Sequence, residues 1–134
     1  MRSGVFVLGT LLATTMILSI TRTGESKGAD EPRKLLRHIV LYKFKEGVTP
    51  AQIDEVVATF AGLKSKIDTI VGFEHGTNVS AEGKSEGLTH CFVVTFRDQQ
   101  GLNTYLQHPA HLNYVNVVRD RREKVVVFDY WTAE

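Results

Sequence analysis

Four stretches with the composition of β-strands alternate with two stretches of helical spacing, and this order limits the fold of the chain most. The strand-like stretches are rich in β-branched and aromatic residues and cover residues 38–44, 73–79, 90–96 and 125–131. The helical stretches run from residue 50 to 67 and from residue 99 to about 122. This β-α-β-β-α-β order predicts an α+β, ferredoxin-like fold, in which the helices cover one face of a four-stranded antiparallel sheet.

The first helical stretch has a clear start and one apolar side. Thr49, Pro50 and Gln52 supply the N-cap, the favoured first-turn proline and the polar third residue of a capping box. Apolar residues then recur at helical spacing, at Ile53, Val56, Val57, Phe60, Leu63 and Ile67. The pattern predicts an amphipathic helix that packs on the sheet.

Two of the strands are apolar on both faces, so the sheet needs a cover on both sides. Residues 91–94 read Cys-Phe-Val-Val and residues 125–128 read Val-Val-Val-Phe, whereas a sheet with one face in water alternates apolar and polar residues. The helices cover only one face, and no segment of the domain remains for the other. A second copy packed sheet against sheet would cover it, so the pattern predicts a barrel-like homodimer.

The first 28 residues have the layout of a secretory signal peptide. Met1-Arg2 is a short positive segment, residues 5–20 are apolar and uncharged, and residues 21–30 are polar. Export, by secretion or to a periplasm, is therefore expected. The alternative is an uncleaved membrane anchor formed by residues 5–20, although this run is shorter than the ~20 residues of a membrane-spanning helix. Residues 29–35 are predicted to be a linker, and residues 36–132 the folded domain.

The charge of the mature domain argues against nucleic acid as a partner. The chain has 16 basic and 15 acidic residues, and loss of residues 1–28 removes three basic residues and one acidic residue, which leaves 13 and 14. Proteins that bind nucleic acid need a basic surface to neutralise phosphates. The basic cluster at 119–124, which includes Arg122, is interrupted by acidic residues and is interpreted as a solvated helix end.

The segment Tyr105-Leu-Gln-His-Pro-Ala-His111 places a phenol and two imidazoles around a helix break. Pro109 disfavours the α region for His108 but suits the first turn of a new helix. His108 should therefore lie at a corner, and His111 in the helix that follows. Counting on from His111 at helical spacing gives a largely apolar stripe of Tyr114, Val115, Val118 and, at its far end, Arg122. A titratable imidazole thus heads the helix face expected to meet the core.

Tyr105 and His111 are the candidate catalytic residues. A buried imidazole has a lowered pKa and stays neutral near pH 7, so it can accept a proton from an acidic carbon. A phenol beside it can donate a hydrogen bond to a developing enolate oxygen. The structural alternative is that His111 bonds a backbone group or a partner subunit and fixes the Pro109 corner.

A metal site is not expected at the two histidines. His108 and His111 are three residues apart, but Pro109 gives them different backbone geometry. No nearby Asp, Glu or Cys completes a set of ligands. If the protein has chemistry, it should be proton transfer without a cofactor.

Seven segments carry a family resemblance. They are His38-Ile-Val-Leu-Tyr-Lys-Phe-Lys, Val48-Thr-Pro-Ala-Gln-Ile, Gly76-Thr-Asn-Val-Ser, Glu86-Gly-Leu-Thr-His, Val93-Val-Thr-Phe, Tyr105-Leu-Gln-His-Pro-Ala-His and Val127-Phe-Asp-Tyr. With these segments the chain resembles the stress-responsive A/B barrel, or Dabb, family. The resemblance implies a ferredoxin-like fold and a dimeric α/β barrel, but it implies no single activity, because most members have none assigned.

One plant enzyme of the family cyclises a polyketide thioester without a cofactor, and the resemblance implies where a pocket would lie. Its catalytic tyrosine and histidine match Tyr105 and His111, and its first-strand pocket histidine matches His38. A pocket tyrosine of that enzyme is replaced here by Phe60, which removes a hydroxyl and argues against the same substrate. The predicted pocket residues are His38, Val40, Tyr42, Val56 and Phe60.

Three functions remain open from the sequence. The first is a homodimeric barrel with a stress-related role that binds a small hydrophobic or aromatic molecule. The second is a cofactor-independent cyclase, isomerase or lyase with His111 as base and Tyr105 as donor. The third is a structural stress protein with no ligand, whose interior is filled by its own aromatic side chains.

Overall fold

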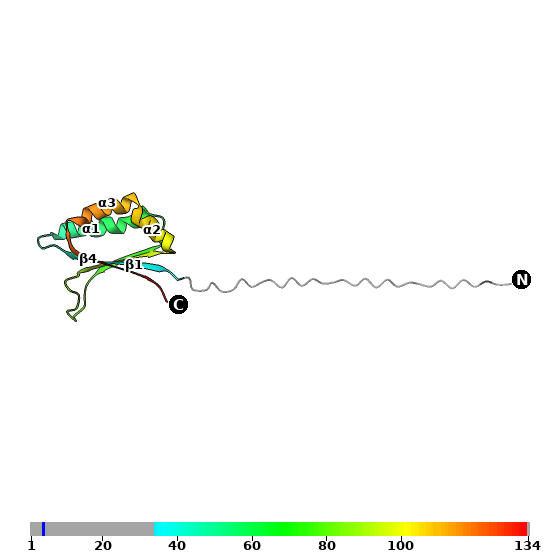
Figure 1. Ribbon diagram of the computed structural model, residues 1–134, viewed down its shortest axis with the longest axis horizontal. Coiled ribbons are helices and arrows are strands. Elements are labelled where there is room, and N and C mark those ends of the chain that lie inside the picture. The colour runs from blue at the N-terminus through cyan, green and yellow to red at the C-terminus, as the bar shows by residue number, and fades with distance from the viewer. Residues whose placement is uncertain (1–3, 5–33, 134) are drawn as a thin grey trace.

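A computed structural model describes Gly4 and residues 34–133 (Figure 1). The predicted leader, apart from Gly4, and residues 29–33 of the predicted linker lie outside the described residues. The elements are β1 (Leu36–Phe44), α1 (Pro50–Ala61), the 3₁₀ turn η1 (Gly62–Ser65), β2 (Gly72–Thr77), β3 (His90–Phe96), α2 (Gln99–Gln107), α3 (Pro109–Arg119) and β4 (Arg122–Trp131). One antiparallel sheet has the strand order β2-β3-β1-β4. The predicted ferredoxin-like fold is confirmed, with the second helical stretch divided into α2 and α3.

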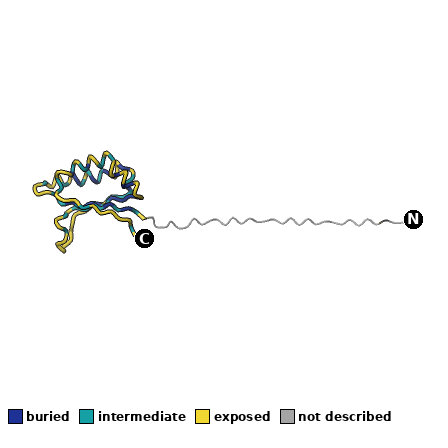
Figure 2. Tube along the Cα trace, in the orientation of Figure 1, coloured by how far each residue is buried: buried dark blue, intermediate teal, exposed yellow. Residues whose placement is uncertain are grey.

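The helices form one layer and the sheet forms the other (Figure 1). Buried residues concentrate between the two layers, and the segment 78–89 extends from the sheet on the side away from the helices (Figure 2). The ends of the domain lie together, because the Leu35 N–H donates to the Thr132 hydroxyl and the Thr132 N–H donates to the Leu35 carbonyl. Within residues 34–133 no helix is long and apolar enough to cross a membrane.

Helix α1 begins as predicted but is shorter. The Thr49 hydroxyl accepts the Gln52 N–H at 3.3 Å, and the Gln52 side-chain oxygen accepts the Thr49 N–H at 2.9 Å, so the capping box is present. The α-helical turns stop at Ala61, not near Ile67, because the chain tightens into η1. Leu63 and Ile67 are nevertheless buried, so the apolar stripe still packs on the sheet.

Three other predicted boundaries move. Strand β2 ends at Thr77, two residues early, because the Asn78 side-chain oxygen accepts the Ser80 N–H and turns the chain. Helix α3 ends at Arg119, and β4 begins at Arg122, three residues before its predicted start, because pairing with β1 continues to that end of the sheet.

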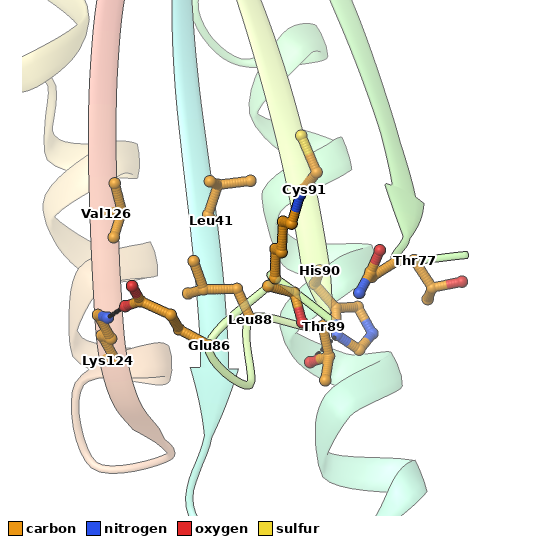
Figure 3. A pocket seen from close by; sticks show the side chains of 12 residues that line it. Leu41, Thr77, Glu86, Leu88, Thr89, His90, Cys91, Lys124 and Val126 are labelled. Atoms are coloured by element: carbon orange, nitrogen blue, oxygen red, sulfur yellow. Dashed lines mark hydrogen bonds and ion pairs between the residues drawn. The ribbon is translucent and has the colours of Figure 1, made fainter. Parts of the chain in front are cut away.

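The face of the sheet away from the helices is apolar and partly exposed. Its apolar residues are Ile39, Leu41, Cys91, Val93, Val126, Phe128 and Tyr130, and we call the face that they line the open face. Figure 3 shows Leu41, Cys91 and Val126 on the neighbouring strands β1, β3 and β4. Phe128 is 61% exposed in the single chain. The strands are thus apolar on both sides, while the helices cover only one of them.

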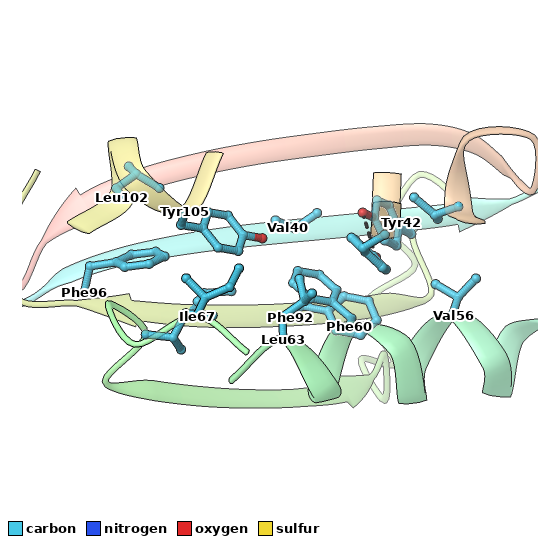
Figure 4. Packing of buried hydrophobic residues seen from close by; sticks show 14 of the residues in the cluster. Val40, Tyr42, Val56, Phe60, Leu63, Ile67, Phe92, Phe96, Leu102 and Tyr105 are labelled. Atoms are coloured by element: carbon cyan, nitrogen blue, oxygen red, sulfur yellow. Dashed lines mark hydrogen bonds between the residues drawn. The ribbon is translucent and has the colours of Figure 1, made fainter. Parts of the chain in front are cut away.

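Aromatic rings fill the space between the layers (Figure 4). Phe60 of α1 stacks on Phe92 of β3 with ring centroids 4.6 Å apart, and its ring lies 4.4 Å from that of Tyr114. Phe92 and Phe96 have no exposed surface. The helices do not fully cover β4, and the helix-side residue Val127 is 52% exposed. This uncovered margin is where the helix layer leaves room for a cavity.

Candidate functional site

A cavity of about 270 Å³ lies between the helices and the β1–β4 half of the sheet. Its lining comes from five elements and comprises His38, Val40, Tyr42, Phe60, Tyr105, Leu106, His111, Tyr114, Val115, Arg122, Val125, Val127 and Asp129. All the predicted site residues lie here except Val56, which is fully buried in the core and does not line the cavity. The arrangement joins an apolar wall to several converging polar groups, which is typical of a small-molecule site.

The break between α2 and α3 positions His111. His108 is the N-cap of α3 with an extended backbone (φ −67°, ψ 135°), and Pro109 begins the helix. The His108 Nδ1 accepts the Ala110 N–H at 3.1 Å, so this imidazole stabilises the corner and does not line the cavity. Among the described residues no three His, Cys, Asp or Glu side chains come together as metal ligands do.

The His111 imidazole has one nitrogen bound and one available. Its Nδ1 lies 3.1 Å from the Leu106 carbonyl oxygen. Because a carbonyl can only accept, Nδ1 carries the proton, and Nε2 of the neutral ring keeps a free lone pair. Burial lowers the pKa of His111, the bond to Leu106 opposes that shift, and a nearby charge on His38 lowers it further. The ring is thus neutral at pH 7 and can act as a base.

Tyr105 is buried between the two imidazoles. Its ring centroid lies 4.3 Å from that of His111 and 5.7 Å from that of His38. Burial raises the pKa of Tyr105, and a charge on Tyr42 would raise it further, so the phenol is protonated at neutral pH. The structure records no hydrogen bond for this hydroxyl within residues 34–133, which leaves it able to donate to a bound molecule.

Asp129 is a site residue that the sequence reasoning missed. Its carboxylate lies 2.6 Å from Nδ1 of His38, and the two residues face each other across β1 and β4. The carboxylate fixes the proton on Nδ1 of His38, as in other carboxylate–histidine pairs. The sequence feature that could have indicated this role is an acidic residue inside the otherwise apolar stretch 125–131.

At the other end of the cavity Tyr42 was predicted, but Tyr114 and Arg122 were missed as site residues. The Tyr114 hydroxyl donates to the Tyr42 hydroxyl at 3.0 Å, deep in the core. Arg122 lies beside this pair, where its charge lowers the pKa of Tyr42 against the larger raising effect of burial. The interpretation of Arg122 as part of a solvated helix end is wrong, because this residue belongs to β4 and lines the cavity.

The pKa of His111 leads to a prediction for stability. The unfolded chain has the ordinary histidine pKa of 6.5, so below this value it binds more protons than the fold. The stability that depends on neutral His111 is therefore fully present above pH 6.5 and is lost as the pH falls towards the folded pKa. In urea titrations between pH 7.5 and pH 5, a His111→Asn variant should lose less stability than the parent. Parallel losses would contradict a half-buried ring that is neutral in the fold.

A larger cavity of about 460 Å³ lies against the other face of the sheet, beside the segment 78–89 (Figure 3). Its rim is bridged by an ion pair of 2.5 Å between Glu86 and Lys124. Leu41, Cys91 and Val126 of the open face form its floor. None of the predicted site residues lies there. The helix-side cavity is therefore the better candidate site, although its volume is smaller.

These features define an α+β protein of ferredoxin-like fold with a cavity between its sheet and its helices. The chain belongs to the stress responsive A/B barrel domain family, Dabb, whose model matches residues 36–132. The family predicted from the sequence segments is thereby confirmed.

Three known proteins illustrate the range of the similarity. Olivetolic acid cyclase from Cannabis sativa is 35% identical over 95 residues, which are 71% of this chain and 94% of the cyclase. The structure of a hydroxynitrile lyase from Passiflora edulis has a TM-score of 0.72 at 26% identity and covers 77% of this chain and 97% of its own. A dimeric ferredoxin-like protein of unknown function from Jannaschia sp. has a TM-score of 0.63 at 29% identity. The match covers 72% of this chain and 97% of the Jannaschia chain.

Proposed function

We propose that the chain is an exported homodimer in which the two open faces pack against each other. The support is the row of apolar side chains on that face, because soluble monomers rarely expose such a surface. The similar protein from Jannaschia sp. is described as dimeric. The support for export is the signal-peptide layout of residues 1–28.

The proposed function is to bind a small hydrophobic or aromatic molecule in the helix-side cavity of each subunit. The observation that carries it is a cavity of about 270 Å³ beside the Tyr105 hydroxyl and the His111 ring. A purely structural protein would fill this space with its own side chains. Val40, Val115 and Val127 supply an apolar wall against which an aromatic ring can pack.

Native mass spectrometry of protein purified from its source tests this proposal. The expected mass is that of two chains that lack the leader, with one small molecule retained per chain. Monomers without any adduct, under conditions that preserve a known dimer, would contradict both the assembly and the ligand. An intact N-terminus would contradict cleavage of the leader.

A second candidate function is catalysis of proton transfer without a cofactor. His111 would take a proton from a carbon next to a carbonyl: the C–H bond breaks, the proton moves to Nε2, and the electron pair moves onto the carbonyl oxygen. The protonated Tyr105 would donate a hydrogen bond to that oxygen. The specific support is the free Nε2 beside a phenol without a partner, together with similarity to a cyclase and a lyase.

Hydrogen–deuterium exchange into an enolisable aromatic ketone, 4-phenyl-2-butanone, separates the two candidates. If the protein is an enzyme, it should speed exchange in D₂O, and His111→Ala should lose roughly 100-fold of that rate while it still binds the ketone. His75→Ala is the matched control, because His75 is exposed on β2 and lies outside the cavity. Binding without exchange in the parent protein would leave the binding function alone.

A further inference from the structure

The two ends of the helix-side cavity carry opposite charges, and this polarity indicates the class of ligand. We propose that the cavity selects a small organic anion, an aromatic or branched carboxylate whose oxyanion binds Arg122 and the Tyr42–Tyr114 hydroxyls. This inference rests on the proposed binding function and adds the chemistry of the ligand. The opposite end, with Tyr105 and His111, would hold the uncharged part of the molecule.

A β-bulge turns Arg122 towards the cavity. Along β4 the residues paired with β1 alternate regularly, with Val125 opposite Tyr42 on the helix side and Lys124 opposite Lys43 on the open side. Continued alternation would place residue 122 on the open side. The register shifts between Lys43 and Phe44, so that Phe44 pairs with Arg122 and not with Glu123. Arg122 therefore lies on the helix side, as Phe44 does. Bulges commonly re-aim a side chain in this way next to functional sites.

Arg122 has no carboxylate partner among residues 34–133, whereas its neighbours do. Arg121 pairs with Glu55 at 2.6 Å, and Lys124 pairs with Glu86 at 2.5 Å. The bulged residue Glu123 pairs with Lys43 at 2.7 Å on the open side, away from Arg122. The guanidinium is therefore available to an oxyanion, which it binds through a planar set of donors.

Two buried hydroxyls complete this end of the cavity. The Tyr114 hydroxyl donates to the Tyr42 oxygen at 3.0 Å, so the hydrogen of the Tyr42 hydroxyl remains to be donated. Both phenols are buried, and both have raised pKa values caused first by burial, so they act as donors. A guanidinium and a phenol side by side match the acceptor atoms of a carboxylate.

The opposite end disfavours a negative charge and thereby sets the orientation of the ligand. Asp129 lies at that end, beside His38. His38 and Tyr42 are four residues apart along β1, so their Cα atoms are separated by about 13 Å. A ligand carboxylate near Asp129 would meet a like charge in a partly desolvated site. The span between the two ends is apolar, with Val40 and Val127, so it suits a carbon skeleton.

Calorimetric titration with isosteric pairs tests the selection. The probes are 3-phenylpropanoate against 3-phenylpropanamide, and 2-naphthoate against 2-naphthamide, at low and at physiological salt. Each carboxylate should bind roughly ten- to a hundredfold more tightly than its amide. Arg122→Gln should abolish this preference, and Arg122→Lys should restore part of it. Arg119→Gln, which removes the same charge from the exposed end of α3, should leave it unchanged.

The outcomes separate this inference from the function on which it rests. If acid and amide bind equally, or if Arg122→Gln keeps the preference, the anion selectivity is wrong although the cavity still binds ligands. If no member of either pair binds, the proposed binding function itself is contradicted. A Tyr114→Phe variant gives a second check, since loss of that hydroxyl should weaken the acid more than the amide.

Discussion

Replacing Phe128 with glutamate should separate the dimer into monomers and weaken association by at least about 4 kcal/mol, or roughly a thousandfold. Phe128 lies on the open face opposite Ile39 of the neighbouring strand and is 61% exposed in the single chain. In a sheet-to-sheet dimer the substitution buries a carboxylate in each copy with no partner. Multi-angle light scattering over a concentration series measures the change in mass.

The matched control for this prediction is Leu112→Glu. Leu112 is 50% exposed on α3, in the helix layer, so the same substitution adds a charge away from the open face. This variant should remain dimeric. A monomeric parent protein, or a dimeric Phe128→Glu variant, would show that the open face is not the interface.

The Phe92→Ala substitution should lower the free energy of unfolding by about 3–5 kcal/mol. Phe92 lies on the central strand β3 with no exposed surface and stacks on Phe60, and its ring is also close to those of Phe73 and Tyr42. Removing the ring opens a cavity where four elements of the fold, β1, β2, β3 and α1, meet. Urea denaturation measures the loss, at one fixed protein concentration because dimer formation contributes to apparent stability.

Val79→Ala is the control for the core prediction. Val79 is 93% exposed in the segment after β2, so its truncation should change stability by less than about 0.5 kcal/mol. A loss below about 1 kcal/mol for Phe92→Ala would mean that the aromatic cluster is not the centre of the core.

The features that the sequence predicted correctly depend on local signals. The capping box at Thr49 and the break at Pro109 are determined by residues close in the chain, and both are present. Strand β3 was predicted to the residue because its apolar run ends sharply on both sides. The end of α1 was wrong because helical spacing of apolar residues continues through a 3₁₀ turn, which buries the same side.

The features that the sequence did not predict depend on pairing between distant segments. Asp129 meets His38 only because β4 pairs with β1, a relation that no local pattern states. Arg122 was assigned to the wrong element because pairing with β1 extends β4 beyond its apolar run, and a bulge then decides the side on which Arg122 lies. Val56 has the spacing of a pocket residue, but it packs wholly within the core. Tyr105 and His111 both line the cavity, because the Pro109 corner positions them locally.

Histidine side-chain NMR with a ¹⁵N label tests most directly that the helix-side cavity is the ligand site. The five histidines lie in different surroundings: His38 and His111 line this cavity, His90 lines the larger cavity on the other face, His108 caps α3, and His75 is exposed. Titration with 3-phenylpropanoate should shift the ring signals of His38 and His111 saturably and leave those of His75 and His90 in place. Shifts confined to His90, or no saturable shift at His111, would contradict a ligand site between the sheet and the helices.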